Sequence, residues 1–171
     1  MDKLQTQAES MEGLAPIGDA RARTLILGSF PSAASLAAAA YYGHPRNHFW
    51  RLLGGVIDEP LHEMPYARRV VRLQVHRIGV WDVIAQCERE GSLDSAIRAE
   101  VANDLAGLLQ RWKQVTRIAF NGGKAASYQK RVAAIAEAAR CVFIVLPSSS
   151  PANATHSFAV KQAAWIAALR Q

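Results

Sequence analysis

The stretch TLILGSFPS, residues 24–32, decides the fold class of this 171-residue chain. Its first five residues, 24–28, are apolar after the leading threonine and end on a glycine, which is typical of a short buried strand. Two more strands of this kind are predicted at 116–120 (TRIAF) and 141–146 (CVFIVL), and a fourth near 74–84. Near-continuous apolar strands favour a mainly parallel sheet that is covered on both faces.

Helical patterns lie between and after these strands. Helices are expected over 31–40, over 47–56 with Gly54-Gly55 as its end, over 121–138 and over 156–170. A longer amphipathic helix is expected over 91–112, where the apolar residues recur every three or four positions and Ser92 or Asp94 would cap the start; they are Ile97, Val101, Leu105, Leu108 and Trp112. Strands that alternate with helices predict an α/β protein.

The composition sets further limits. Half of the residues are apolar, which suits one domain, and we expect a loose leader over 1–20 before a single domain over 21–171. The formal net charge of +6 makes nucleic acid a candidate partner. Cys87 and Cys141 lack metal-site spacing, no apolar run is long enough for a membrane span, and the polar N-terminus is unlike a signal peptide. A cytoplasmic protein without a membrane partner is therefore expected.

Chemically rich segments follow the three best strands. They are GSFPS (28–32), NGGKA (121–125) and PSSSPAN (147–153), and YYGHPRNHFW (41–50) comes shortly after the first. Ligands of parallel sheets gather at the carboxyl ends of the strands, so these segments are expected to meet at one edge. The segment 41–50 holds more aromatic and polar side chains than an ordinary loop needs, which predicts a flat, polar ligand there.

The chain resembles the uracil-DNA glycosylase superfamily, above all its hypoxanthine-DNA glycosylase branch. The resemblance lies in five segments between Thr24 and about His156: LILGSFPSAASL, YYGHPRNHFW, WDVIAQCEREGSLDSAI, FNGGKA and LPSSSPANA. It implies a three-layer α/β/α sandwich around a mainly parallel sheet. It also implies a monofunctional enzyme that flips a deaminated base out of DNA and hydrolyses its N-glycosidic bond with a positioned water, leaving an abasic site. Hypoxanthine is the preferred base, and uracil stays open as a second one.

The same resemblance implies the partners. Damaged DNA is the substrate, the protein is a monomer of bacterial type that works at the nucleoid, and neither a metal nor a small-molecule cofactor is needed.

Asn47, in HPRN, is the expected catalytic residue. Members of the superfamily commonly hold the attacking water with a polar residue of the first motif, but here that motif is GSFP, and Phe30 cannot position water. An amide can suffice, because positioning and charge stabilisation matter more than basicity in an oxocarbenium-like transition state. The alternative for Asn47 is to cap the helix that follows, and the two roles are compatible.

Five residues are expected to bind the base. Tyr42 lies where related enzymes stack an aromatic ring on it. Asn121 offers a carboxamide that can pair with the lactam of hypoxanthine or of uracil, or can instead cap the next helix. Just beyond Gly28, the main-chain N–H groups of Ser29 and Phe30 are placed to support negative charge on the leaving base.

The loop 147–153 matches the motif with which the superfamily presses on DNA around the flipped nucleotide. Hydroxyls, amides and cations bind phosphate oxygens without reading sequence, and the candidates are Ser148, Ser149, Ser150, Asn153, Lys124 and Arg46. By composition alone the loop would be an ordinary turn. A lysine nucleophile at Lys124 would make a strand-cleaving enzyme, which the resemblance to monofunctional hydrolases disfavours.

Two rival functions stay open. One is a uracil or thymine mismatch glycosylase. The other is a non-catalytic protein that binds lesions but lost turnover when Phe30 replaced the usual polar group. A serine hydrolase is disfavoured because no G-x-S-x-G turn is present. Asp82 and His156 have no assigned mechanism.

Overall fold

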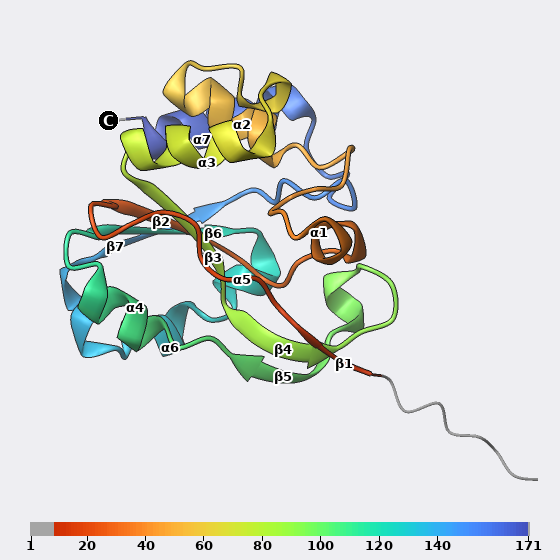
Figure 1. Ribbon diagram of the computed structural model, residues 1–171, viewed down its shortest axis with the longest axis vertical. Coiled ribbons are helices and arrows are strands. Elements are labelled where there is room, and N and C mark those ends of the chain that lie inside the picture. The colour runs from red at the N-terminus through yellow and green to blue at the C-terminus, as the bar shows by residue number, and fades with distance from the viewer. Residues whose placement is uncertain (1–8, 171) are drawn as a thin grey trace, which may run out of the picture.

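The centre of the computed structural model, which describes residues 9–170, is a parallel four-stranded sheet in the order β3-β2-β6-β7 (Figure 1). Its strands are β2 (Thr24–Gly28), β3 (Ile78–Asp82), β6 (Arg117–Asn121) and β7 (Val142–Leu146). All residues of β2 and β3 are buried, as expected for strands covered on both faces. The four predicted strands are therefore confirmed.

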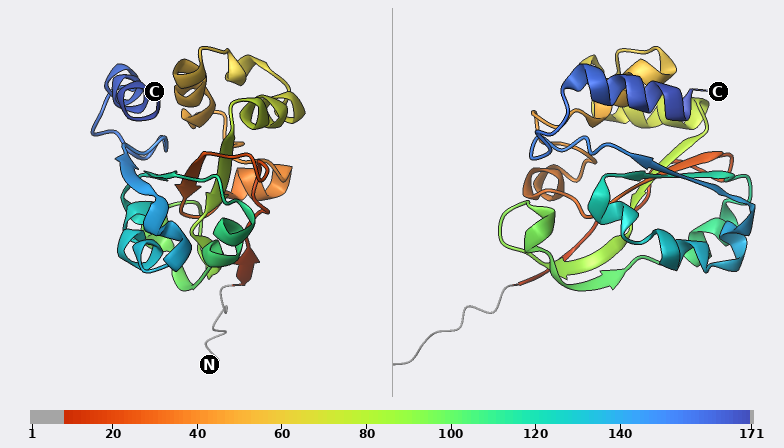
Figure 2. Two further views of the ribbon diagram at one scale, coloured as in Figure 1. Left: turned by 90° about the vertical axis from the view of Figure 1, so that its left-hand side faces the viewer. Right: turned by 180° about the vertical axis from the view of Figure 1, so that it is seen from behind.

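Helices cover both faces of this sheet (Figures 1 and 2), which confirms the three-layer α/β/α fold. One face carries α2 (Phe49–Ile57), α3 (Tyr66–Val75) and α7 (Phe158–Leu169), and the other carries α4 (Leu105–Arg111) and α6 (Gln129–Ala133). Two short helices follow strand ends, α1 (Ala33–Ala38) after β2 and α5 (Gly123–Ala126) after β6. The 3₁₀ turns are η1 (Leu61–Glu63), η2 (Asp94–Ala96) and η3 (Ala136–Arg140).

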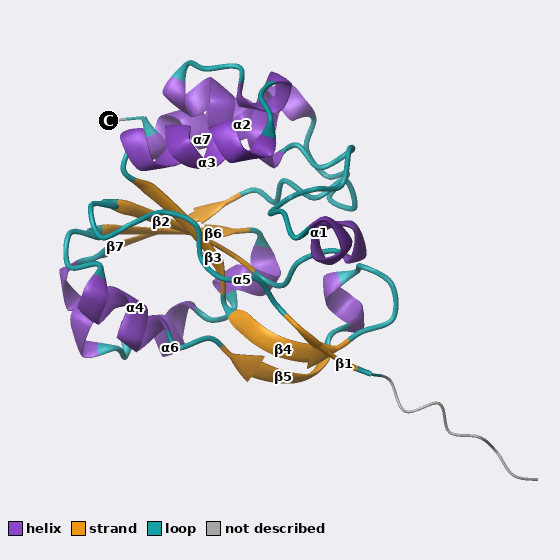
Figure 3. Ribbon diagram, in the orientation of Figure 1, coloured by secondary structure: helices purple, strands orange, loops and turns teal. Residues whose placement is uncertain are grey.

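A second, antiparallel sheet has the order β1-β4-β5 (Figure 3). Its strands are β1 (Ser10–Glu12), β4 (Ile84–Glu88) and β5 (Arg98–Ala102). Val83 alone separates β3 from β4, so the chain passes directly from one sheet into the other.

The prediction of a loose leader over 1–20 is wrong for the described part of that segment. Ser10 pairs with Glu88 in the second sheet, and Ile17 bridges to Val80 of β3. These pairings are non-local, so a polar N-terminal sequence does not reveal them. Residues 1–8 lie outside the described residues.

The prediction of one helix over 91–112 is also wrong. The segment contains η2, then β5 paired with β4, and only then α4. The start of α4 is capped by Asp104, whose carboxylate accepts from the main-chain N–H of Gly107 at 2.9 Å, rather than by Ser92 or Asp94. The apolar spacing fits a helix, but hydrogen bonds to β4 decide the structure of its first half.

Two smaller predictions are also corrected: where the helix α2 ends, and how fully the strand β7 is covered. α2 continues through Gly54 to Ile57, and its C-cap is Asp58, whose φ is +59°. Gly54 instead lets the chain that follows the helix pack closely, because a Cβ there would meet the carbonyl oxygen of Glu59 at 2.5 Å. β7 is an edge strand, with Val142 and Val145 63% and 56% exposed, so it is not covered as fully as its composition suggests.

The helix expected over 121–138 is broken into α5, α6 and η3. No helix within residues 9–170 is long and apolar enough to cross a bilayer.

Candidate active site

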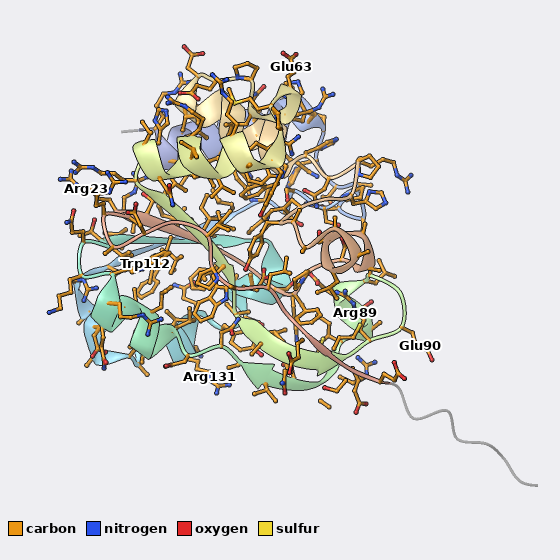
Figure 4. All side chains as sticks on the ribbon, in the orientation of Figure 1. Arg23, Glu63, Arg89, Glu90, Trp112 and Arg131 are labelled. Carbon is orange, nitrogen blue, oxygen red and sulfur yellow. The ribbon has the colours of Figure 1, made fainter. Side chains whose placement is uncertain are left out.

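A cavity of about 340 Å³ lies at the carboxyl ends of the parallel strands, a volume in the range of small-molecule sites. Figure 4 marks the two ends of β2 by two labelled arginines that lie on opposite sides of the molecule. Arg23 directly precedes β2, and Arg89 donates a hydrogen bond to the carbonyl oxygen of Pro31, in the loop that follows β2. The predicted residues that line the cavity are Gly28, Ser29, Phe30, Tyr42, Asn47, Asn121, Ser148, Ser149, Ser150 and Asn153. The expected convergence of the four segments is therefore confirmed.

Two contacts hold the ring of Tyr42, one with its face and one with its hydroxyl. The ring stacks on Phe49, with centroids 3.8 Å apart and planes 12° apart, and the hydroxyl accepts from Asn121 Nδ2 at 3.1 Å. Burial raises the pKa of Tyr42, so the hydroxyl stays neutral. Gly28 makes room for it, because a Cβ on Gly28 would lie 2.7 Å from the Tyr42 hydroxyl oxygen.

Asn121, the last residue of β6, is hydrogen-bonded to the loop that follows β7. Its Nδ2 also donates to Ser149 Oγ at 2.9 Å, and its Oδ1 accepts from the main-chain N–H of Ser149 at 2.9 Å. Both amide hydrogens and one lone pair of the oxygen are thus used within the protein. Gly122 follows with φ of +94°, and a Cβ there would meet the Ser148 side chain at 2.8 Å. The carboxamide therefore holds the loop 147–153 against β6.

Asn47 lines the cavity and also supports the start of a helix. Its Oδ1 accepts from the main-chain N–H of Phe49, the first residue of α2, at 2.9 Å, whereas the N-cap residue itself is His48, one position later than the alternative expected. The adjacent His48 donates its main-chain N–H to the carbonyl oxygen of Ser149 at 3.0 Å, and His44 Nδ1 accepts from the N–H of Arg46 at 3.1 Å. The turn that presents Asn47 is thus anchored on both sides.

The segment after β2 offers free donors. Among residues 9–170, no hydrogen bond occupies the main-chain N–H groups of Ser29 and Phe30. Ser29 Oγ donates to Asp94 Oδ1 at 2.6 Å, which links this segment to the turn after β4. The Phe30 ring is buried, and the guanidinium carbon of Arg89 lies 5.2 Å from its centroid. Phe30 therefore contributes its main chain rather than its ring to any ligand.

Sequence reasoning missed one wall of the cavity. Ser92, Leu93, Asp94 and Ser95 line it, although they were assigned to the start of a helix. The signal was present in the resemblance, because these residues belong to the matched segment WDVIAQCEREGSLDSAI. Only the pairing of β4 with β5 folds that segment back to the cavity.

Sequence reasoning also left Asp82 without a role. It lines the cavity at the end of β3, is 4% exposed, and its Oδ2 has no hydrogen-bond partner among residues 9–170. Burial, with a smaller contribution from the negative charge of Asp94, raises its pKa to about 7. A polar residue that ends an apolar strand was the available signal.

The loop 147–153 is held by its own hydrogen bonds and by α7. Ser149 is 1% exposed and its hydroxyl is enclosed with Asn121, so only Ser148 and Ser150 remain phosphate candidates among the three serines. Asn153 Nδ2 donates to the carbonyl oxygen of Ser148 at 3.4 Å. Buried Lys161 of α7 donates to the carbonyl oxygen of Ser150 at 3.4 Å.

Two of the predicted DNA contacts lie outside the cavity. Lys124 Nζ is 2.9 Å from Glu100 Oε2 on β5, which pairs its charge away from the cavity lining. Arg46 is exposed, one residue before Asn47. No cluster of His, Cys, Asp and Glu side chains suited to a metal ion occurs in the part of the chain that the structure describes.

Comparison with known proteins gives consistent matches. The family model of the uracil DNA glycosylase superfamily matches residues 15–169. A hypoxanthine DNA glycosylase of Methanosarcina acetivorans is 42% identical over 141 residues, covering 82% of this chain and 87% of the relative. One of Methanosarcina barkeri is 35% identical over 160 residues, covering 94% and 98%.

The fold has a solved counterpart. The solution NMR structure of a Methanosarcina acetivorans protein, provisionally assigned as a uracil DNA glycosylase, superposes with a TM-score of 0.83. The two chains are 39% identical, and the match covers 95% of this chain and 98% of the other.

Proposed function

The chain belongs to the uracil DNA glycosylase superfamily, and we propose that it is a monofunctional DNA glycosylase that releases hypoxanthine from DNA. The enzyme flips the deaminated nucleotide into the cavity, hydrolyses the N-glycosidic bond with a water molecule and leaves an abasic site. The observation that carries this proposal is the shared cavity of Tyr42, Asn47 and the free N–H groups after Gly28.

Tyr42 supplies the stacking surface. Phe49 covers one face of its ring, so the base stacks on the opposite face. Stacking on an aromatic side chain contributes about 1–3 kcal/mol per base. The ring is held by Phe49 and Asn121 before any base arrives, so little ordering is needed on binding.

Asn47 holds the attacking water. Its Oδ1 is tied to the N-terminus of α2, which fixes the plane of the carboxamide and leaves Nδ2 to donate to the water oxygen. A fixed amide positions the water without taking its proton early, which suits a transition state that resembles an oxocarbenium ion. The N–H groups of Ser29 and Phe30 stabilise negative charge on the departing base.

The DNA backbone contacts the rim of the cavity. Ser148, Ser150 and Asn153 lie there on one loop, and exposed Arg46 lies beside Asn47. Such contacts bind phosphate without reading sequence, and the net charge of +6 favours association with DNA. We also propose that the enzyme acts as a cytoplasmic monomer and without a cofactor.

The experiment is single-turnover release of free base from duplexes that carry inosine, uracil or a G·T mismatch, without added metal. Wild type is expected to release hypoxanthine fastest. Asn47→Ala is expected to slow release by about 10²-fold or more, the effect of losing one stabilising group. A wild type that prefers uracil or thymine would identify a mismatch glycosylase instead.

The loss of the hydrogen bond to the start of α2 must be separated from the loss of the water contact. Asn47→Ser is the matched control, since a serine hydroxyl can accept the same kind of main-chain hydrogen bond but cannot present the same amide donor. Asn47→Ser is therefore expected to unfold like wild type and to be as slow as Asn47→Ala. A serine variant with the wild-type rate would remove Asn47 from the chemistry.

A further inference from the structure

A second cavity, of about 690 Å³, lies at the end of the parallel sheet opposite to the candidate active site. It is lined by residues at the starts of β2, β3 and β6 and at the ends of α2 and α7, and the proposed mechanism uses none of them. β2 has five residues, so about 17 Å of strand separates the two cavities. Figure 4 labels Arg23 at this end of the molecule and Arg89 near the other.

The lining of this second cavity, called the basic cavity below, is rich in positive charge. Its charged side chains, apart from a histidine, are those of Arg23, Arg77, Arg117, Arg170 and Asp58. The described lining of the active-site cavity instead holds two aspartates, Asp82 and Asp94, and neither lysine nor arginine. The basic character of the chain is therefore concentrated at an end of the sheet where no base is bound.

The sheet brings three of these arginines into a row. Arg77 and Arg23 directly precede β3 and β2, and Arg117 begins β6. The N–H of Arg23 donates to the carbonyl oxygen of Arg77 at 2.8 Å, and the N–H of Arg117 donates to that of Arg23 at 3.2 Å. Neighbouring strands lie about 4.8 Å apart, so the three positions span about 10 Å. Such a row matches the repeated phosphates of a nucleic acid better than a single anion.

Two of the four guanidinium groups are used inside the protein and two are free. Arg117 donates to main-chain carbonyl oxygens at the end of α7, and Arg170 donates to those at the end of α2. Arg23 and Arg77 are exposed, and their side chains make neither a hydrogen bond nor a salt bridge with any other residue of 9–170. These two side chains are therefore available to an anion from outside the chain.

The backbone at Arg77 gives an independent indication. Its φ is +56°, in the left-handed region that favours glycine, at the point where α3 gives way to β3. Its N–H donates to the carbonyl oxygen of Gln74 at 3.1 Å, which closes the end of the helix. Residues held in this region cluster at functional sites. An exposed arginine where glycine is less strained points to a role for its side chain.

We propose that the basic cavity binds the phosphate backbone of a second DNA segment while the candidate active site holds the first. Arg23 and Arg77 pair with phosphate oxygens, and Arg117 and Arg170 add positive charge behind them. A straight duplex whose flipped base enters the active-site cavity lies against the other end of the sheet, so it does not also reach these arginines. The protein therefore bridges two segments and can pass from one to the other. This inference goes beyond the proposed function and shares with it only that DNA is the partner.

The test is capture of a fluorescent undamaged duplex by the same duplex fixed on beads. Wild type is expected to hold the two duplexes together at low salt, because DNA binds at both ends of its sheet. The double variant Arg23→Gln, Arg77→Gln is expected to capture at least about tenfold less, since two phosphate contacts are lost. Its single-turnover release of hypoxanthine from a short inosine duplex should stay at the wild-type rate.

Two controls separate charge from structure. The double variant Lys130→Gln, Arg131→Gln removes two exposed charges from α6, on the other face of the sheet, and should capture DNA like wild type. The double variant Arg23→Lys, Arg77→Lys keeps both charges and should also capture DNA, because lysine binds phosphate as a point charge. Urea unfolding of all variants shows that they are folded.

Three results would overturn this inference. The first is a wild type that captures no duplex. The second is full capture by the glutamine variant of Arg23 and Arg77, which would mean that bridging arises elsewhere, as from pairing of two protein molecules. The third is binding of 5′-AMP that depends on these two arginines without any capture of DNA, which would assign the basic cavity to a small phosphorylated ligand.

Failure of this inference and failure of the proposed function are distinguishable. Capture of DNA by a protein that releases no base from any duplex would refute the proposed function and leave the second DNA site standing. Base release without capture would do the reverse.

Discussion

Gly28→Ala is the substitution that tests most strictly how the cavity floor, the part of the lining formed by Gly28, Asp82 and Tyr42, is packed. A Cβ at this position would lie closer than 3.0 Å to Asp82 Oδ1 and 2.7 Å from the Tyr42 hydroxyl. Neither neighbour can move freely, because Asp82 is buried and Tyr42 is held by Phe49 and Asn121. Forcing one extra methyl group into such a site costs about 1–3 kcal/mol of stability.

The effect on base release follows from the displaced ring. If the alanine methyl group tilts Tyr42 away, stacking worth about 1–3 kcal/mol is lost, and each 1.4 kcal/mol corresponds to about tenfold in rate. Release of hypoxanthine should therefore slow by about 5-fold to about 140-fold, measured under single-turnover conditions alongside urea unfolding.

Gly123→Ala is the matched control. No heavy atom lies within 4 Å of a Cβ built on Gly123, which begins α5, and alanine is a better helix former than glycine. This variant should keep wild-type activity and stability. If Gly28→Ala also behaves like wild type in both measurements, the account of a floor shared by Gly28, Asp82 and Tyr42 is refuted.

Three further substitutions separate stability from function. Asp82 binds its proton more tightly in the folded protein, with a pKa of about 7, than in the unfolded chain, where it is about 3.9. The free energy of unfolding of wild type should therefore fall as pH rises from about 4 to about 7, by about 1.4 kcal/mol for each pKa unit. Urea unfolding of Asp82→Asn should lack that slope. An equal slope in both proteins would contradict the raised pKa of Asp82. Ser149→Ala leaves a buried hydrogen of Asn121 without its acceptor, so it should cost about 1–3 kcal/mol in thermal unfolding and slow base release, and unchanged release would mean that the loop anchor is dispensable. Asp104→Ala removes the cap of α4, so it should cost about 1 kcal/mol in urea unfolding with base release unchanged, and a slow variant would show that α4 supports the cavity.

The sequence predicts the parts of this fold that local patterns determine. β2, β6 and β7 are short apolar runs that end at glycine, asparagine or proline-rich segments, so their carboxyl ends could be placed before the structure was known. The principle that parallel strands share one edge then brings Gly28, Asn47 and Asn121 to one cavity. The resemblance supplies the chemistry, which local patterns do not.

The remainder depends on contacts between distant residues. The apolar spacing over 91–112 suits a helix, but pairing of β5 with β4 makes its first half a strand. The same pairing places Asp94 beside Ser29. Which polar side chain is hydrogen-bonded within the protein also depends on tertiary neighbours, so the sequence does not show that Asn121 bonds to Ser149 or that Asp82 Oδ2 has no partner among residues 9–170.

The most direct test of the central claim is chromatographic detection of free hypoxanthine after wild-type protein meets inosine-containing DNA in a buffer with a metal chelator. The account predicts that free base appears in a 1:1 ratio with alkali-labile abasic sites and that the DNA strand stays intact before alkali. Tight binding of the inosine duplex without any released base would contradict it.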